Sequence, residues 1–160
     1  MHSLNHFIFS FSLCLLLLEP NLQNIFWAAI FSLVFSVLID LDHWYKKIKR
    51  PWFARRTWIQ EPPALFLIAL PIALLLRFLN PSFFYLTLTS FSSHILLDYL
   101  CVFKAYPLAP FSKLEKPEGF GIFVPATHKW RRRIKGKVSE NYFLIFNFIF
   151  LLATLYFKLG

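Results

Sequence analysis

Histidine and aspartate side chains interrupt the long apolar segments of this chain, and they are the groups best suited to chemistry. His94 and Asp98 are four residues apart, which places both on one face of a helix. Asp40, Asp42 and His43 end another apolar segment as Asp-Leu-Asp-His. Ionisable groups inside an apolar span are energetically costly and indicate a functional site. Because imidazole and carboxylate groups are common ligands of divalent metals, both motifs are candidate metal sites.

Two more residues extend this candidate set. His6 lies near the start of the first apolar segment, and Glu61 lies just before the third. A closed metal site needs three or four ligands, and no single segment supplies them in good geometry. We therefore expect one pocket that several helices build together. The alternatives are that helix-end Asp and His are ordinary interfacial residues, or that a His–Asp pair only hydrogen-bonds two helices.

Five apolar segments must position these residues. Hydrophobic residues make up 58% of the 160 residues and charged residues 16%, which differs from the composition of a soluble domain. Each segment is near the roughly 17–25 residues that cross a bilayer, where the backbone must be helical. The sequence predicts an all-α, polytopic membrane helical bundle that forms a single domain over residues 1–160. The expected helices are 4–18, 22–39, 63–79, 82–103 and 141–159. A secretory signal over the first segment is disfavoured because the first Lys or Arg is Lys46.

Positive charge predicts the orientation of this bundle. Loops 40–61 and 104–140 hold six and nine Lys or Arg residues, and only Arg77 and Lys158 lie elsewhere. Since Lys and Arg near helix ends stay on the cytoplasmic side, both loops are expected in the cytoplasm, with the N-terminus inside and the C-terminus outside. The expected location is the cell (inner) membrane, in a multi-pass arrangement. The candidate ligands then all lie in the cytoplasmic half: His6, Asp40, Asp42, His43, Glu61, His94 and Asp98.

The same charges bear on possible partners. The net charge of +9 is explained by membrane insertion, and no nucleic-acid-binding motif is present, so nucleic acid is not an expected partner. Membrane lipid is the expected partner, and the basic run from Lys129 to Lys137 can attract anionic lipid. The favoured interpretation of that run is a topology anchor. The sequence leaves the oligomeric state open.

The order of these motifs resembles the YdjM-like inner-membrane metal-dependent hydrolases. Members of that family carry an early His, an Asp-x-Asp-His segment, an Arg/Thr/His segment and a Ser-His-x-x-x-Asp segment. The corresponding positions here are His6, Asp40-Leu41-Asp42-His43, and Ser93-His94 with Asp98. Pro110-Phe111-Ser112 is similar to the family's Pro-Phe-Ser stretch, so the resemblance covers residues 4–112. The family is in turn distantly similar to zinc-dependent phospholipase C and single-strand nucleases.

One segment departs from the family pattern. Where the family has Thr-His after an arginine, this chain reads Arg55-Arg56-Thr57-Trp58-Ile59-Gln60-Glu61, so the histidine position falls on Gln60 or Glu61. Since a carboxylate is a better ligand than an amide, we assign the metal-binding role to Glu61, which favours harder ions such as manganese; lost activity is the alternative. Arg56 is a candidate for binding an anionic group, because its planar guanidinium matches phosphate; an inside anchor is the equal alternative.

The resemblance implies a membrane-embedded metal-dependent hydrolase that acts at the cytoplasmic face on a phosphoester or other ester of a lipid-like substrate. The expected cofactor is a divalent metal, zinc first and manganese second. Of the two aspartates that follow the second apolar segment, Asp40 is the candidate catalytic base and Asp42 a candidate ligand, although the sequence does not decide between them. The rival hypothesis is a non-catalytic membrane protein, either a metal carrier or a structural protein with a hydrogen-bonded polar cluster.

The predicted topology can be tested with single cysteines. Lys113→Cys is expected to lie in the cytoplasm and Asn80→Cys on the opposite side, because the positive loops stay inside. An impermeant thiol reagent added to intact cells should label only the Asn80→Cys variant. Labelling of Lys113→Cys from outside would overturn the orientation.

Overall fold

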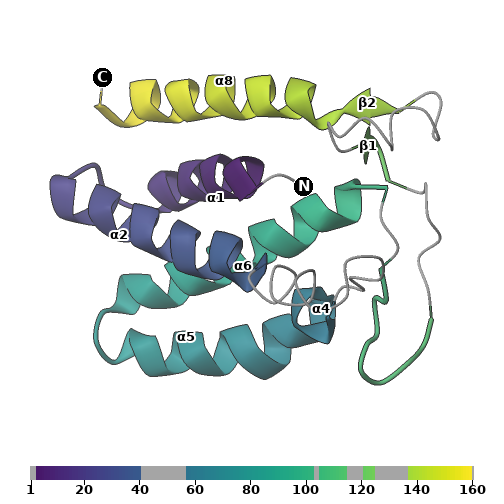
Figure 1. The fold of residues 1–160 in the computed structure, drawn as a ribbon. Coiled ribbons are helices and arrows are strands. Elements are labelled where there is room, and N and C mark those ends of the chain that lie inside the picture. The colour runs from purple at the N-terminus through teal and green to yellow at the C-terminus, as the bar shows by residue number, and fades with distance from the viewer. Residues whose placement is uncertain (1–2, 41–56, 103–104, 115–120, 125–136, 160) are drawn as a thin grey trace.

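The computed structural model describes residues 3–40, 57–102, 105–114, 121–124 and 137–159, and the chain is mostly helical there (Figure 1). Five helical rods run beside one another. Two rods contain π-helical turns, at Leu33–Val37 (η1) and Leu65–Ala69 (η4). The elements in chain order are α1 (Ser3–Leu17), α2 (Leu22–Ser32), η1, η2 (Leu38–Asp40), η3 (Trp58–Gln60), α4 (Pro62–Ala64), η4, α5 (Leu70–Arg77), α6 (Pro81–Leu100), β1 (Phe123–Val124), β2 (Val138–Ser139) and α8 (Glu140–Leu159).

Asparagine caps set where two of the helices begin. The side chain of Asn21 accepts a hydrogen bond from the backbone N–H of Asn24 at 2.7 Å, at the start of α2. The side chain of Asn80 accepts one from the N–H of Ser82 at 2.9 Å, and Pro81 occupies the first turn of α6. Such caps satisfy amide donors that have no partner within the helix. They close two helical hairpins, α1 with α2 and α5 with α6.

Helix α1 lies at the centre of the bundle and packs against α2, α6 and α8, whereas α5 packs on α6 (Figure 1). One apolar cluster includes Cys14, Leu15, Phe31 and Leu86, where α1, α2 and α6 meet. The outer faces are also apolar. Large side chains exposed on α8 include Ile145, Phe146, Ile149, Leu152 and Phe157.

Many of the most deeply buried side chains are polar. Those with a relative exposure of 2% or less in α1, η1, α2, α6 and α8 include Asn5, His6, Ser10, Ser32, Ser36, His94 and Asn147. An apolar exterior around a polar interior is the arrangement expected when lipid, rather than water, surrounds the helices. The packing therefore agrees with a membrane setting.

Within the described residues, two helices are both long enough and apolar enough to cross a bilayer, Leu22–Asp40 and Glu140–Lys158. The helices Ser3–Leu17 and Pro62–Arg77 are apolar but shorter. Helix α6 has 20 residues but carries hydroxyl, imidazole and carboxylate groups along its length. Two candidate spans thus agree with membrane insertion, and the five-span arrangement with the N-terminus inside stays a prediction.

A small parallel sheet departs from the expected all-α fold. Phe123 pairs with Val138 and Val124 with Ser139, within the expected loop 104–140. The sheet is fastened to the end of α6, because the N–H of Ile122 donates to the carbonyl of Leu100 at 2.8 Å and that of Val102 donates to Phe123 at 3.0 Å. A Cβ at Gly121 would lie 2.0 Å from the carbonyl oxygen of Cys101, so only glycine fits there.

Replacing Gly121 should destabilise this attachment. A Gly121→Ala methyl group meets backbone rather than a movable side chain, so the backbone must shift, at a cost of about 1–3 kcal/mol. The thermal unfolding temperature in detergent should fall. Ile122→Ala, which truncates an exposed neighbour, is the matched control and should leave that temperature nearly unchanged. Equal stability of both variants would contradict the close approach.

Candidate metal centre

Two histidines and an aspartate from two helices converge in the interior. His6 lies on α1, and His94 and Asp98 lie one turn apart on α6. One ligand atom from each of the three residues can be chosen so that all lie within 4.8 Å of one another. The Nε2 atom of His6 is 3.3 Å from Oδ1 of Asp98, and Nε2 of His94 is 3.2 Å from its Oδ2. The carboxylate therefore faces both imidazole rings.

The π-helical turn η1, which follows α2, orients His94. The Nδ1 atom of His94 lies 2.7 Å from the carbonyl oxygen of Ser36 in η1. A carbonyl only accepts, so Nδ1 carries the proton and the lone pair of the neutral ring is on Nε2. The hydroxyl of the same Ser36 donates to the carbonyl of His6 at 3.1 Å. Single π turns are frequent at functional sites, and this one fixes both histidine-bearing helices.

Three ring nitrogens in this cluster are buried without a hydrogen bond in the described part of the chain: Nδ1 and Nε2 of His6, and Nε2 of His94. Leaving such a group unpaired costs about 1–3 kcal/mol. The two rings also stack, with centroids 4.3 Å apart and planes at 23°, so charging both would bring like charges into contact. An ion pair with Asp98 can therefore satisfy at most one ring at little cost.

A divalent cation fits this donor set better. Around tetrahedral zinc, with bonds of about 2.0–2.1 Å, neighbouring ligand atoms are about 3.3–3.4 Å apart. The nitrogen-to-oxygen distances of 3.3 and 3.2 Å, each to a different oxygen of Asp98, are close to this spacing. Zinc binds imidazole nitrogen and carboxylate oxygen readily, and a larger share of oxygen ligands favours manganese. The residues thus fit a bound cation.

Asp40 lies beside this cluster and is more exposed than its members. Its Oδ1 atom lies 3.6 Å from Nε2 of His94, and its side chain is 26% exposed, compared with 7% for Asp98 and 0% for His94. The side-chain amide of Gln60 donates to the same Oδ1 at 2.9 Å. Asp40 is therefore the more exposed carboxylate beside the candidate centre.

Glu61 has different partners. Its Oε2 accepts a hydrogen bond from the hydroxyl of Tyr99 at 2.5 Å, and its Oε1 accepts one from the N–H of Tyr106 at 2.9 Å. The carboxylate joins the start of α4 to the end of α6, and it is not among the three residues that converge. Its assignment as a metal ligand stays a prediction, and Gln60 is the residue of this pair that contacts Asp40. Asp42, His43 and Arg56 lie outside the described residues.

Sequence reasoning missed several supporting residues. Asn147 on α8 donates to the carbonyl and the side-chain oxygen of Asn5, at 3.3 and 3.1 Å, and so holds α1 next to His6. Asn147 interrupts an apolar segment, which is a usable signal for such a role. The carbonyl of Ser36 offered no signal, because any residue type has a carbonyl.

Polar contacts continue along α1 beyond the cluster of His6, His94 and Asp98. The hydroxyl of Ser10 donates to Ser32 at 3.1 Å, and the thiol of Cys14 lies 3.3 Å from the hydroxyl of Ser90. His6, Ser10 and Cys14 recur every fourth position and so share one face of α1. The pairs Ser10–Ser32 and Cys14–Ser90 join α1 to α2 and to α6, and their small side chains allow these helices to approach closely.

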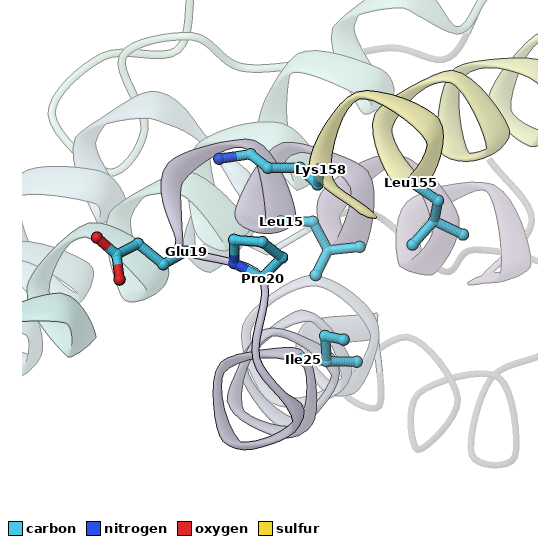
Figure 2. A pocket seen from close by; sticks show the side chains of 6 residues that line it. All are labelled: Leu15, Glu19, Pro20, Ile25, Leu155 and Lys158. Carbon is cyan, nitrogen blue, oxygen red and sulfur yellow. The ribbon is translucent and has the colours of Figure 1, made fainter. Parts of the chain in front are cut away.

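The opposite end of the bundle carries a different feature. A small pocket lined by Leu15, Glu19, Pro20, Ile25, Leu155 and Lys158 lies there (Figure 2). The ammonium group of Lys158 donates to the carbonyl of Leu18 at 2.8 Å. A cation beside the last carbonyls of a helix stabilises its C-terminal end. This contact holds α8 against the end of α1. We therefore interpret the pocket as a feature of helix packing.

Comparison with known proteins gives one match. A family model described as YdjM inner membrane protein matches residues 1–159, which is nearly the whole chain. Neither the curated proteins nor the solved structures contain a match.

Metal binding should require ligands from both helices. His6→Ala, His94→Ala and Asp98→Asn should each lower the divalent metal bound per chain, because each removes one of three converging donors. Elemental analysis of protein purified in detergent measures this content. Thr87→Val, which removes a buried hydroxyl on α6 that donates to the carbonyl of Phe83 in the same helix, is the control. Unchanged metal in all three ligand variants, with helices intact, would contradict a shared centre.

Proposed function

The chain belongs to the YdjM inner membrane protein family, and we propose that it is a membrane-embedded metal-dependent hydrolase. In this proposal His6, His94 and Asp98 hold the cation. The substrate is a phosphoester or other ester of a lipid-like molecule that reaches the centre from the cytoplasmic face.

The observation that carries the proposal is the convergence of unsatisfied buried nitrogens on one carboxylate. Three protein ligands that leave a position open are typical of catalytic zinc sites, whereas structural sites use four. A divalent cation bound in this way lowers the pKa of a water molecule and polarises a phosphoryl or acyl oxygen. The resemblance of the ligand motifs to metal-dependent hydrolases points to the same chemistry, as an analogy.

The chain's own residues have separate roles in this proposal. Asp98 places its two carboxylate oxygens opposite Nε2 of His6 and of His94, where they would share the cation with both rings. Asp40, the more exposed carboxylate beside the cluster, accepts the proton of the attacking water. Burial of His6 and His94 among helices excludes bulk water from the rear of the centre. Asp42 and His43 are proposed as further ligands or supports, and Arg56 as the group that binds the anionic part of the substrate.

The location of the centre supports access from one leaflet. The first turns of α1, α4 and α8 and the last turns of α2 and α6 lie at the same end of the bundle (Figure 1). His6, Asp40 and Asp98 belong to this end. Loops 40–61 and 104–140, which connect these helix ends in the sequence, are rich in Lys and Arg. Such loops favour the cytoplasmic side and attract anionic headgroups. We therefore propose a multi-pass arrangement with the centre near the cytoplasmic headgroup layer.

Hydrolysis can be measured directly with the full chain in detergent. We expect metal-loaded protein to cleave bis(p-nitrophenyl) phosphate or an anionic phospholipid in mixed micelles. A chelator should remove the activity, and Zn²⁺ or Mn²⁺ should restore it. Asp98→Asn should lower the rate by about 100-fold, the upper end of the 10–100-fold that supporting residues of metal centres contribute. Gln23→Leu, at an exposed site near the other end of the bundle, is the control.

The outcome also separates the rival functions. A protein that binds metal but cleaves none of a broad panel of phosphate and carboxylate esters would contradict hydrolysis and favour a metal carrier. A folded protein that binds no metal would favour a structural role for the polar cluster.

A further inference from the structure

Gln60 bonds the carboxylate of Asp40, which lies beside the candidate metal centre. Its side-chain amide donates to Oδ1 of Asp40 at 2.9 Å, and that oxygen is the one that lies 3.6 Å from Nε2 of His94. Gln60 is 1% exposed, although it belongs to a short segment outside the long helices. A buried amide that bonds a carboxylate beside a ligand is suited to setting where that carboxylate points.

The backbone of Gln60 is fixed by the residues around it. The turn η3 closes through hydrogen bonds from Gln60 to Thr57 and from Glu61 to Trp58, both 3.1 Å. Immediately after Gln60, the buried carboxylate of Glu61 binds Tyr99, the neighbour of Asp98 in sequence. The contact between Glu61 and Tyr99 thus holds the segment that carries Gln60 against α6, the helix that supplies His94 and Asp98.

The chemical type of this residue matters. An ionised acid at this position would repel Asp40, and a lysine would neutralise the charge that Asp40 presents to a cation. An amide donates a hydrogen bond and carries no charge. Gln60 can therefore fix Asp40 and leave its negative charge directed at the centre.

We propose that Gln60 is a positioning residue, which holds the Asp40 carboxylate beside the cation site and acts on the cation through Asp40. This inference rests on the proposed metal centre and deepens it. It assigns a defined function to Gln60, a residue that ligand chemistry alone ranks below Glu61.

A double-mutant cycle on Co²⁺ binding tests this role. The full chain in detergent is titrated with Co²⁺ alone, whose visible absorption reports both affinity and coordination. The variants are Gln60→Leu, Asp40→Asn and their combination. A hydrogen bond to a charged group corresponds to about 10-fold in affinity, so each single variant should weaken Co²⁺ binding by about that factor. The double variant should bind no more weakly than Asp40→Asn, and its absorption spectrum should be the same.

The controls separate positioning from general packing. Gln23→Leu makes the same chemical change at an exposed site and should leave the Co²⁺ affinity unchanged. If Gln60→Leu loses its helical circular dichroism, Gln60→Asn takes its place, because it keeps the amide but shortens its reach.

Each outcome bears on a different claim. Wild-type affinity in Gln60→Leu, or a further 10-fold loss when Gln60→Leu is added to Asp40→Asn, would overturn the positioning role, since independent sites add. A wild-type chain that binds no Co²⁺ would overturn the metal centre and this role with it. A cycle that behaves as expected in a protein without hydrolytic activity would overturn only the hydrolase.

Discussion

The contact between Asp98 and the two buried imidazole rings is the interaction on which the arrangement of the helices depends. It joins α1 to α6 through polar groups that apolar surroundings cannot satisfy. Because the exterior of the bundle is apolar, these groups have no stable place except the interior. The helices must therefore meet with their polar faces together, and the π turn at Ser36 adds α2 to the same contact.

The rest of the bundle holds this contact at a defined geometry. Asn147 binds Asn5 and fixes α8 beside the residue that precedes His6. Small hydroxyl and thiol pairs, Ser10 with Ser32 and Cys14 with Ser90, let the helices pack closely further along. Lipid-facing positions carry large apolar residues instead, which contribute little to how one helix recognises another. Specific packing in this protein thus comes largely from its polar residues.

The pair Gln60 and Glu61 illustrates how neighbouring residues can take unrelated positions. Both are buried, and ligand chemistry alone favours the carboxylate as the residue nearest a metal. The turn η3 instead directs the amide towards Asp40 and the carboxylate towards Tyr99 and Tyr106. Adjacent side chains leave the backbone in different directions, so a one-residue difference in register decides which of them reaches the centre.

The sequence by itself determined the helical class, the apolar segments and the pairing of His94 with Asp98, because these depend on composition and on the helical period within one segment. It also marked His6 and Asp40 as polar residues at helix ends. Only the tertiary structure decided that His6 stacks on His94, that Ser36 presents its carbonyl, and that Gln60 contacts Asp40. Those contacts depend on how each helix is rotated and displaced against its neighbours, and many weak packing interactions between distant segments set these quantities together.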